Sequence, residues 1–181
     1  MIRVVSQKEI DEYLEKAKKQ YKKRRYDKVL VFYQKILIEK PKHKEALLGR
    51  AQVYQHNEEF LEAVKDYNQV LESEPLNREA LLGKGNALML SDYFDEALPC
   101  FNKVIELNSK DPDGHYGKGL IYYYTGDKTE ARVWYNKAIQ YGPEKNYRSY
   151  DPVPIKTILR SVEVVFLIIA VIIIVLIVRS F

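Results

Sequence analysis

The chain has little of what disulfide-rich, metal-binding or catalytic proteins need. Its single cysteine, Cys100, excludes an intrachain disulfide framework and fits a small buried hydrophobe better than a reactive thiol. Its three histidines, His43, His56 and His115, are far apart and lack the i, i+4 spacing that suits a metal. No serine or cysteine lies in a catalytic constellation, so we expect no enzyme, no cofactor and no metal site.

Strong net charge is also missing, and so is an apolar segment at the beginning of the chain. The formal net charge is only +4, which gives no general reason to expect nucleic acid as a partner. Residues 1–10 contain no apolar stretch followed by a cleavage site, so we expect no secretory signal. Gly83-Lys84-Gly85 and Gly117-Lys118-Gly119 resemble parts of a phosphate-binding loop, but the full spacing and the following Ser or Thr are absent.

What the chain does have is a unit that recurs every 34 residues. Small residues, aromatic residues and a closing proline each return at that step, and the string Glu-Ala-Leu-Leu-Gly occurs at both 45–49 and 79–83. The recurring sets are Ala17, Ala51, Gly85 and Gly119; Val29, Ala63, Ala97 and Ala131; Tyr33, Tyr67, Phe101 and Tyr135; and Pro41, Pro75 and Pro143, with Ser109 in the remaining place.

The spacing inside each unit predicts two helices joined by a short turn. Ala97, Phe101 and Val104 fall at i, i+4 and i+7, which is one face of an α-helix. The small residues of the first helix leave room for the aromatic residue of the second, and each proline ends a second helix. One hairpin cannot bury its apolar face alone, so neighbouring hairpins must stack.

These residues resemble the tetratricopeptide repeat, a helix-turn-helix unit of the same length. The aromatics Tyr26, Phe60 and Phe94 fit that pattern, whereas Lys128 departs from it in the fourth unit. A second departure places Lys16, Arg50, Lys84 and Lys118 where the family usually has Leu. The resemblance implies an all-α solenoid of four repeats within 1–143, at about 10–43, 44–77, 78–111 and 112–143, and it implies a concave face that binds a peptide or a partner protein.

In that family the first helix of each unit faces the concave side. The resemblance therefore places an exposed partner-binding groove at Leu14, Lys18, Tyr21, Leu48, Gln52, Gln55, Leu82, Asn86, Met89, Tyr116, Leu120 and Tyr123. Among Tyr122, Tyr123 and Tyr124 at least one phenol should reach this wall, although packing on a following helix is an equal alternative. Repeats that hold acidic chaperone tails use cationic clamps, and Glu79 in this groove would repel such a tail.

Two groups of charged residues have open interpretations. Asp11, Glu45, Glu79 and Asp113, near the start of each first helix, either compensate helix dipoles or form an acidic stripe that prefers basic partners. A basic patch at the end of the first helix is either a solvated capping face or a surface that attracts anionic lipid or an acidic partner, with nucleic acid the least favoured. The patch comprises Lys18, Lys19, Lys22, Lys23, Arg24 and Arg25.

The end of the chain differs from the repeats. Residues 144–157 include Pro152 and Pro154 and are predicted to be an extended linker. Residues 158–181 are predicted to form a transmembrane tail anchor, because 162–178 are almost entirely apolar and span about 25 Å as a helix. An apolar cap on the last repeat is the alternative. Flanking cations before the run favour a cytoplasmic location for the repeats.

The sequence thus predicts a single-pass membrane protein whose cytoplasmic repeats capture or hold a partner as an adaptor or receptor. The alternative is a structural subunit of a membrane complex that assembles through its C-terminal helix. The expected contacts are a protein or peptide in the groove and a bilayer around 162–178, with no nucleic acid.

Overall fold

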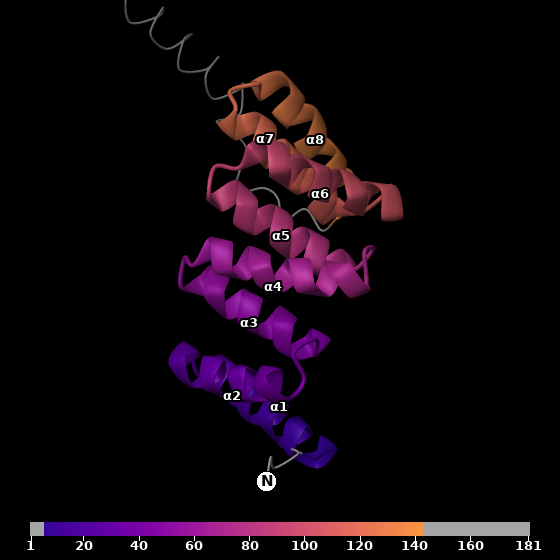
Figure 1. The fold of residues 1–181 in the computed structure, drawn as a ribbon. Coiled ribbons are helices and arrows are strands. Elements are labelled where there is room, and N and C mark those ends of the chain that lie inside the picture. Colours follow the sequence, from indigo (N-terminus) through magenta and orange to yellow (C-terminus); the bar gives the residue numbers. More distant parts are fainter. Residues whose placement is uncertain (1–5, 143–181) are drawn as a thin grey trace, which may run out of the picture. The chain divides into compact units, whose positions relative to one another are not determined.

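A computed structural model describes residues 6–142, and Met1–Pro143 form one compact unit. The described part contains eight α-helices and no strand. Figure 1 shows them stacked as successive hairpins in chain order. Their bounds are α1 Gln7–Lys22, α2 Tyr26–Glu39, α3 Lys44–His56, α4 Phe60–Ser73, α5 Arg78–Leu90, α6 Phe94–Leu107, α7 Pro112–Tyr124 and α8 Lys128–Tyr141. The all-helical repeat architecture predicted from the sequence is therefore confirmed.

Polar side chains define where the first helix of each repeat begins. Ser6, His43, Asn77 and Asp111 are the N-cap residues of α1, α3, α5 and α7, and each side chain accepts a hydrogen bond from a backbone amide in the first turn. Ser6 and Glu9 complete a capping box, as their spacing predicts. Because these amides would otherwise lack partners, the caps fix the position at which each repeat starts.

The turns inside the repeats share one backbone feature. Arg24, Glu58, Asp92 and Gly126 lie 34 residues apart, and all have positive φ, at 54°, 63°, 63° and 92°. Only Gly126 takes up this left-handed conformation without a steric penalty. The other three turns keep a charged residue in a strained position, so the geometry of the repeat overrides local preference there.

Aromatic residues of the second helices join each repeat to the next. A Cβ added to Gly117 would lie 2.2 Å from Phe101 Cε1, and one added to Gly83 would lie 2.2 Å from Tyr67 Cζ. The ring of Phe101 also faces Gly85 of its own repeat, where an added Cβ would be 3.0 Å away. The ring of Phe101 therefore fills the space between Gly85 of its own first helix and Gly117 of the next, and its contact with Gly85 is the packing that the sequence predicts.

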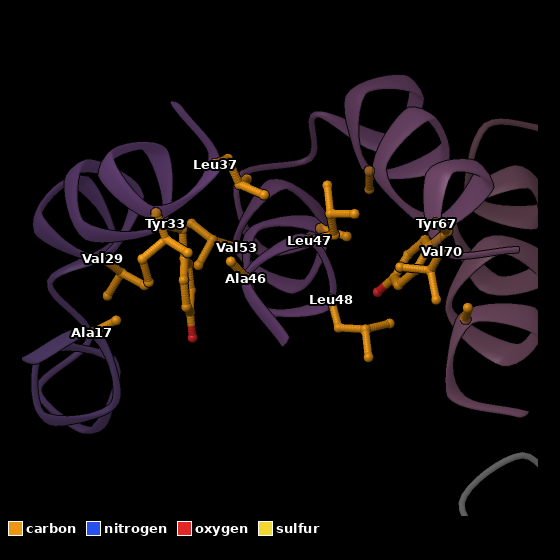
Figure 2. Packing of buried hydrophobic residues seen from close by; sticks show 14 of the residues in the cluster. Ala17, Val29, Tyr33, Leu37, Ala46, Leu47, Leu48, Val53, Tyr67 and Val70 are labelled. Atoms are coloured by element: carbon orange, nitrogen blue, oxygen red, sulfur yellow. The ribbon is translucent and has the colours of Figure 1, made fainter. Parts of the chain in front are cut away.

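The buried residues form two clusters along the stack. One spans α1 to α5, and Figure 2 shows part of it, with Tyr33 and Tyr67 placed at successive helix interfaces. The second spans α5 to α8 and includes Cys100, which is buried as expected. Burial raises the pKa of the Cys100 thiol, with a smaller opposing effect of Lys84. The apolar face of each hairpin is thus covered by its neighbours.

The cations that replace the usual leucine have different partners in different repeats. Arg50 donates two hydrogen bonds of 2.7 Å to the carboxylate of Asp66, whose side chain is only 3% exposed. In the fourth repeat Trp134 occupies the place of Asp66, and the Lys118 ammonium lies 4.0 Å from the centre of its ring. A buried ion pair in one repeat is therefore replaced by a cation–π contact in another.

The predicted linker at 144–157 and the predicted tail at 158–181 lie outside the described residues. Among the helices of 6–142, none combines the length and the apolar character needed to cross a bilayer.

Candidate partner-binding groove

A pocket of about 560 Å³ opens on the first helices of repeats one and two. Four predicted groove residues contribute to it, Lys18 and Tyr21 from α1 and Leu48 and Gln52 from α3. The remaining lining residues are Lys22, Tyr33, Lys44, Glu45, Gly49 and Glu79. The pocket has the volume of a typical ligand site, but charged side chains contribute half of its lining.

The floor of the pocket is apolar and is set by a close approach between two helices. The ring of Tyr33, on α2, lies so near Gly49 of α3 that an added Cβ would be 2.3 Å from its Cζ. Leu48 is 8% exposed and borders the same space. In Figure 2 the Tyr33 hydroxyl and the Leu48 side chain project to the same side of the stack. Burial raises the pKa of Tyr33, and Glu45 raises it further, so the phenol stays protonated at neutral pH.

Ion pairs and amide hydrogen bonds connect the repeats around this floor. Lys18 Nζ lies 2.9 Å from Glu45 Oε1, and this hydrogen bond raises the pKa of Lys18. Gln52 Nε2 donates to Glu79 Oε1 at 2.9 Å. Each contact joins the first helix of one repeat to the beginning of the first helix of the next. Both signs of charge are therefore present at the rim, which suits a polar or zwitterionic peptide segment more than a purely anionic one.

The acidic residues of the predicted stripe have partners within the protein. Asp11 accepts from Gln7 Nε2 at 2.8 Å, and Asp113 accepts from the guanidinium of Arg78 at 2.6 Å. Glu45 is bound to Lys18 and Glu79 to Gln52, so two of the four acidic residues link successive repeats. Contacts within the protein therefore explain why these positions are acidic, and no basic partner is needed to explain it.

Asp111, next to this row, is only 3% exposed. Burial favours its neutral form, but hydrogen bonds from Arg78 and from the Gly114 amide outweigh burial and hold the pKa of Asp111 below its usual value. The same contacts raise the pKa of Arg78. The carboxylate therefore stays ionised, and it caps α7 while pairing with α5.

The other predicted groove residues differ in how far they are exposed. Leu14, Met89 and Leu120 are buried, at 6–7% exposure, and so is Leu48 of the pocket floor, so the expected exposure of all four is wrong; neighbouring helices approach closely enough to cover them. Tyr116 and Leu82 are half-buried against the second core cluster. Gln55 is held by Tyr67 and by the Gly83 carbonyl, whereas Asn86 and Tyr123 are exposed. Tyr122 packs on the second core cluster and Tyr123 faces solvent, and a phenol of this run on the groove wall stays a prediction.

Tyr21 lies at the junction between the pocket and an aromatic cluster. Its hydroxyl is 2.6 Å from His56 Nε2, and the His56 ring stacks on Tyr26 with 4.9 Å between centroids and an interplanar angle of 11°. Phe94 stacks on Tyr124 at the corresponding place two repeats later. The aromatic residue that begins each of these second helices therefore contacts the end of the following first helix, which explains its recurrence in the sequence.

Sequence reasoning missed Tyr33 as a groove residue because it considered only first helices. A signal was present, since Gly49, Gly83 and Gly117 recur at the repeat step and each follows a buried aromatic by 16 residues. Lys44 was also missed, and its ammonium is bound to Glu74 at 2.8 Å. Neither contact is visible from the periodicity of one helix.

Comparisons with known proteins agree with this architecture. Models of the tetratricopeptide repeat match residues 47–92, 85–126 and 112–145. No curated protein matches the chain.

Among solved structures, a MamA protein is similar with 25% identity and a TM-score of 0.68, covering 74% of this chain and 73% of that one. A tetratricopeptide repeat protein from Parabacteroides merdae shares 25% identity with a TM-score of 0.65, covering 74% of this chain and 52% of its own. A thermophilic repeat protein of Thermus thermophilus, at 19% identity and a TM-score of 0.64, shares the fold over 73% of this chain and 74% of its own.

Proposed function

The chain carries tetratricopeptide repeats, and from that premise we propose that it is an adaptor or receptor that binds a partner protein or peptide in its concave groove. The observation that carries the proposal is the pocket of about 560 Å³ on α1 and α3, with an apolar floor at Tyr33 and Leu48 and a charged rim. Such a floor can hold an apolar side chain of a peptide, while the rim selects its polar neighbours.

The polar groups of the pocket support recognition of a peptide rather than catalysis. Within the described residues, the Lys22 ammonium has no ion pair or hydrogen bond, and the Tyr33 hydroxyl has no hydrogen bond to another residue. Both can therefore bind a ligand without giving up an internal contact. Lys18 is paired with Glu45, and Gln52 donates to Glu79, so these two pairs supply a preorganised rim.

The second half of the proposal is a membrane tether. The apolar run at 162–178 has the length of a short membrane-spanning helix, and the arginines Arg160 and Arg179 flank it. The cations before the run support a cytoplasmic position for the repeats, by the positive-inside rule. An adaptor held at a bilayer would bring its groove partner to that surface, which is the role we assign to the protein.

The experiment uses a photo-crosslinking amino acid at Gln52, inside the pocket, and at Val31, which is 52% exposed on α2 and outside the pocket lining, as the matched control. Crosslinking is done in native membranes with the full chain. Partner capture at Gln52, absent at Val31, supports the groove. Equal capture at both positions overturns it.

A deletion then separates the adaptor from the assembly subunit. Residues 1–143, without the linker and tail, should still compete for the captured partner if the groove binds it. Loss of binding with the tail removed would instead favour a subunit that assembles through its C-terminal helix. Extraction of the full chain from membranes by alkaline carbonate would exclude the tether and leave the groove untouched.

A further inference from the structure

Five cations lie in the last turn of α1 and in the loop that joins it to α2, and we name them the basic turn: Lys19, Lys22, Lys23, Arg24 and Arg25. All five are exposed, and within residues 6–142 their side chains make no ion pair and no hydrogen bond. Lys18, which the sequence groups with them, is different, because it pairs with Glu45 and Glu15. The structure thus reduces the predicted basic patch to a smaller set of cations that form no ion pair within residues 6–142.

The repeat architecture does not require positive charge at this turn. The turns at the same place in the next three repeats carry Glu58 and Glu59, then Asp92, then Asp127. The backbone conformation is the same in all four, with a positive φ at the corresponding residue. The sign of the charge is therefore free to vary, and only the first repeat concentrates cations.

The basic turn is presented on an ordered backbone. Arg24 N donates to Tyr21 O at 2.8 Å and Arg25 N donates to Gln20 O at 3.1 Å, so both arginines leave the end of α1 in fixed directions. Tyr21 and Tyr26, both half-buried, lie beside the turn and contact each other edge to face at 5.6 Å. Tyrosines next to cations are typical of surfaces that meet the headgroup region of a bilayer.

We propose that the basic turn docks on anionic lipid headgroups of a membrane. This inference deepens the proposed tether, because a chain anchored at 162–178 holds the turn near a bilayer at high effective concentration. Each lysine or arginine close to an anionic surface strengthens binding by about fivefold. Docking would fix how the repeats lie on the membrane. Nucleic acid is the less favoured polyanion, since the chain has no nucleic-acid-binding motif beside the turn.

The test uses residues 1–143, which form a compact unit with their own buried clusters, so the tail cannot contribute. Circular dichroism first checks that this fragment is helical. Its binding is then measured by co-sedimentation with vesicles of phosphatidylcholine alone and with vesicles containing one-third phosphatidylserine. We expect binding only to the anionic vesicles, falling at least tenfold when the ionic strength rises from low salt to about 0.5 M, where the Debye length is only a few ångströms.

Two variants of equal charge change locate the contact. Changing Lys22, Lys23, Arg24 and Arg25 to Gln should weaken binding by 100-fold or more, at about fivefold per charge. The matched control changes four exposed cations of the last two repeats to Gln and should alter binding by less than fivefold; these are Lys103, Lys110, Lys128 and Arg132. The double variant Arg24→Lys with Arg25→Lys should bind like the wild type, because lipid attraction needs charge rather than guanidinium geometry.

Several results would overturn the proposal. These are equal binding to neutral vesicles, an equal effect of the two four-residue variants, or tighter salt-sensitive binding to single-stranded RNA than to anionic vesicles. Saturable binding of free inorganic phosphate at the same residues, without vesicle binding, would overturn it too. Failure of the full chain to resist carbonate extraction would remove the tether but not the basic turn, so the two ideas fail separately.

Discussion

Replacing Gly117 by Ala tests the packing that joins one repeat to the next. Gly117 lies in the interior of α7, where alanine is intrinsically the better helix former by about 1 kcal/mol. Local preference alone therefore predicts a more stable protein. The tertiary structure predicts the opposite, because an added Cβ would lie 2.2 Å from Cε1 and 2.4 Å from Cδ1 of Phe101.

The size of the loss follows from how firmly Phe101 is held. Its side chain is fully buried, and its ring also faces Gly85, so it has no free space into which to move. Overpacking a dense core costs about 1–3 kcal/mol, and a contact this short belongs in the upper part of that range. After subtracting the gain of about 1 kcal/mol in helix preference, Gly117→Ala should lower the free energy of unfolding by about 1–2 kcal/mol.

The assay is urea unfolding of residues 1–143, followed by far-UV circular dichroism. Gly85→Ala is the matched control, because its Cβ would meet the same ring at 3.0 Å and should cost less. Combining Gly117→Ala with Phe101→Leu should destabilise by less than the sum of the two single changes, since the smaller side chain makes room. The reasoning is refuted if Gly117→Ala is as stable as the wild type or more stable.

Three further predictions concern other contacts of the repeats. Asp66→Ala should lower the free energy of unfolding by about 3 kcal/mol, because it leaves the guanidinium of Arg50 without its carboxylate partner in a largely buried site. Urea unfolding measures this loss, and a loss under 1 kcal/mol would contradict the prediction. Glu58 and Gly126 both have positive φ, which glycine adopts without strain. Glu58→Gly should therefore raise the free energy of unfolding by roughly 0.5–1 kcal/mol, and Gly126→Ala should lower it by about 1 kcal/mol. A lower melting temperature for Glu58→Gly, or a higher one for Gly126→Ala, would contradict this. The pKa of Asp111 is lowered in the folded state, because hydrogen bonds from Arg78 and from a backbone amide outweigh the effect of burial. This carboxylate therefore stabilises the fold fully above its unfolded pKa of about 4, and that stabilisation is lost as the pH falls through its folded pKa. Asp111→Asn should therefore flatten the loss of stability below pH 4 in an acid titration, and an unchanged profile would exclude this carboxylate as its source.

Part of the candidate groove could be predicted from the sequence and part could not. Lys18, Tyr21, Leu48 and Gln52 border one pocket, because the helical period determines which residues of a first helix share a face, although Leu48 is buried and not exposed as predicted. Whether those residues bind a partner remains a prediction. Tyr33 belongs to the same pocket but comes from a second helix, so no single-helix pattern could include it.

The sequence by itself determined the repeat length, the start of the first helix, the position of each turn and the pairing of small with aromatic residues. These features depend on the helical period, on capping residues and on side-chain volume. All three are local properties, and they recur from repeat to repeat. Only the tertiary structure decided that Leu14, Met89 and Leu120 are covered, and that Lys18 is bound to Glu45 while the cations of the basic turn stay unpaired. Exposure and charge pairing depend on the distance between helices and on the side chains of the neighbouring repeat, and those are set only when the hairpins stack.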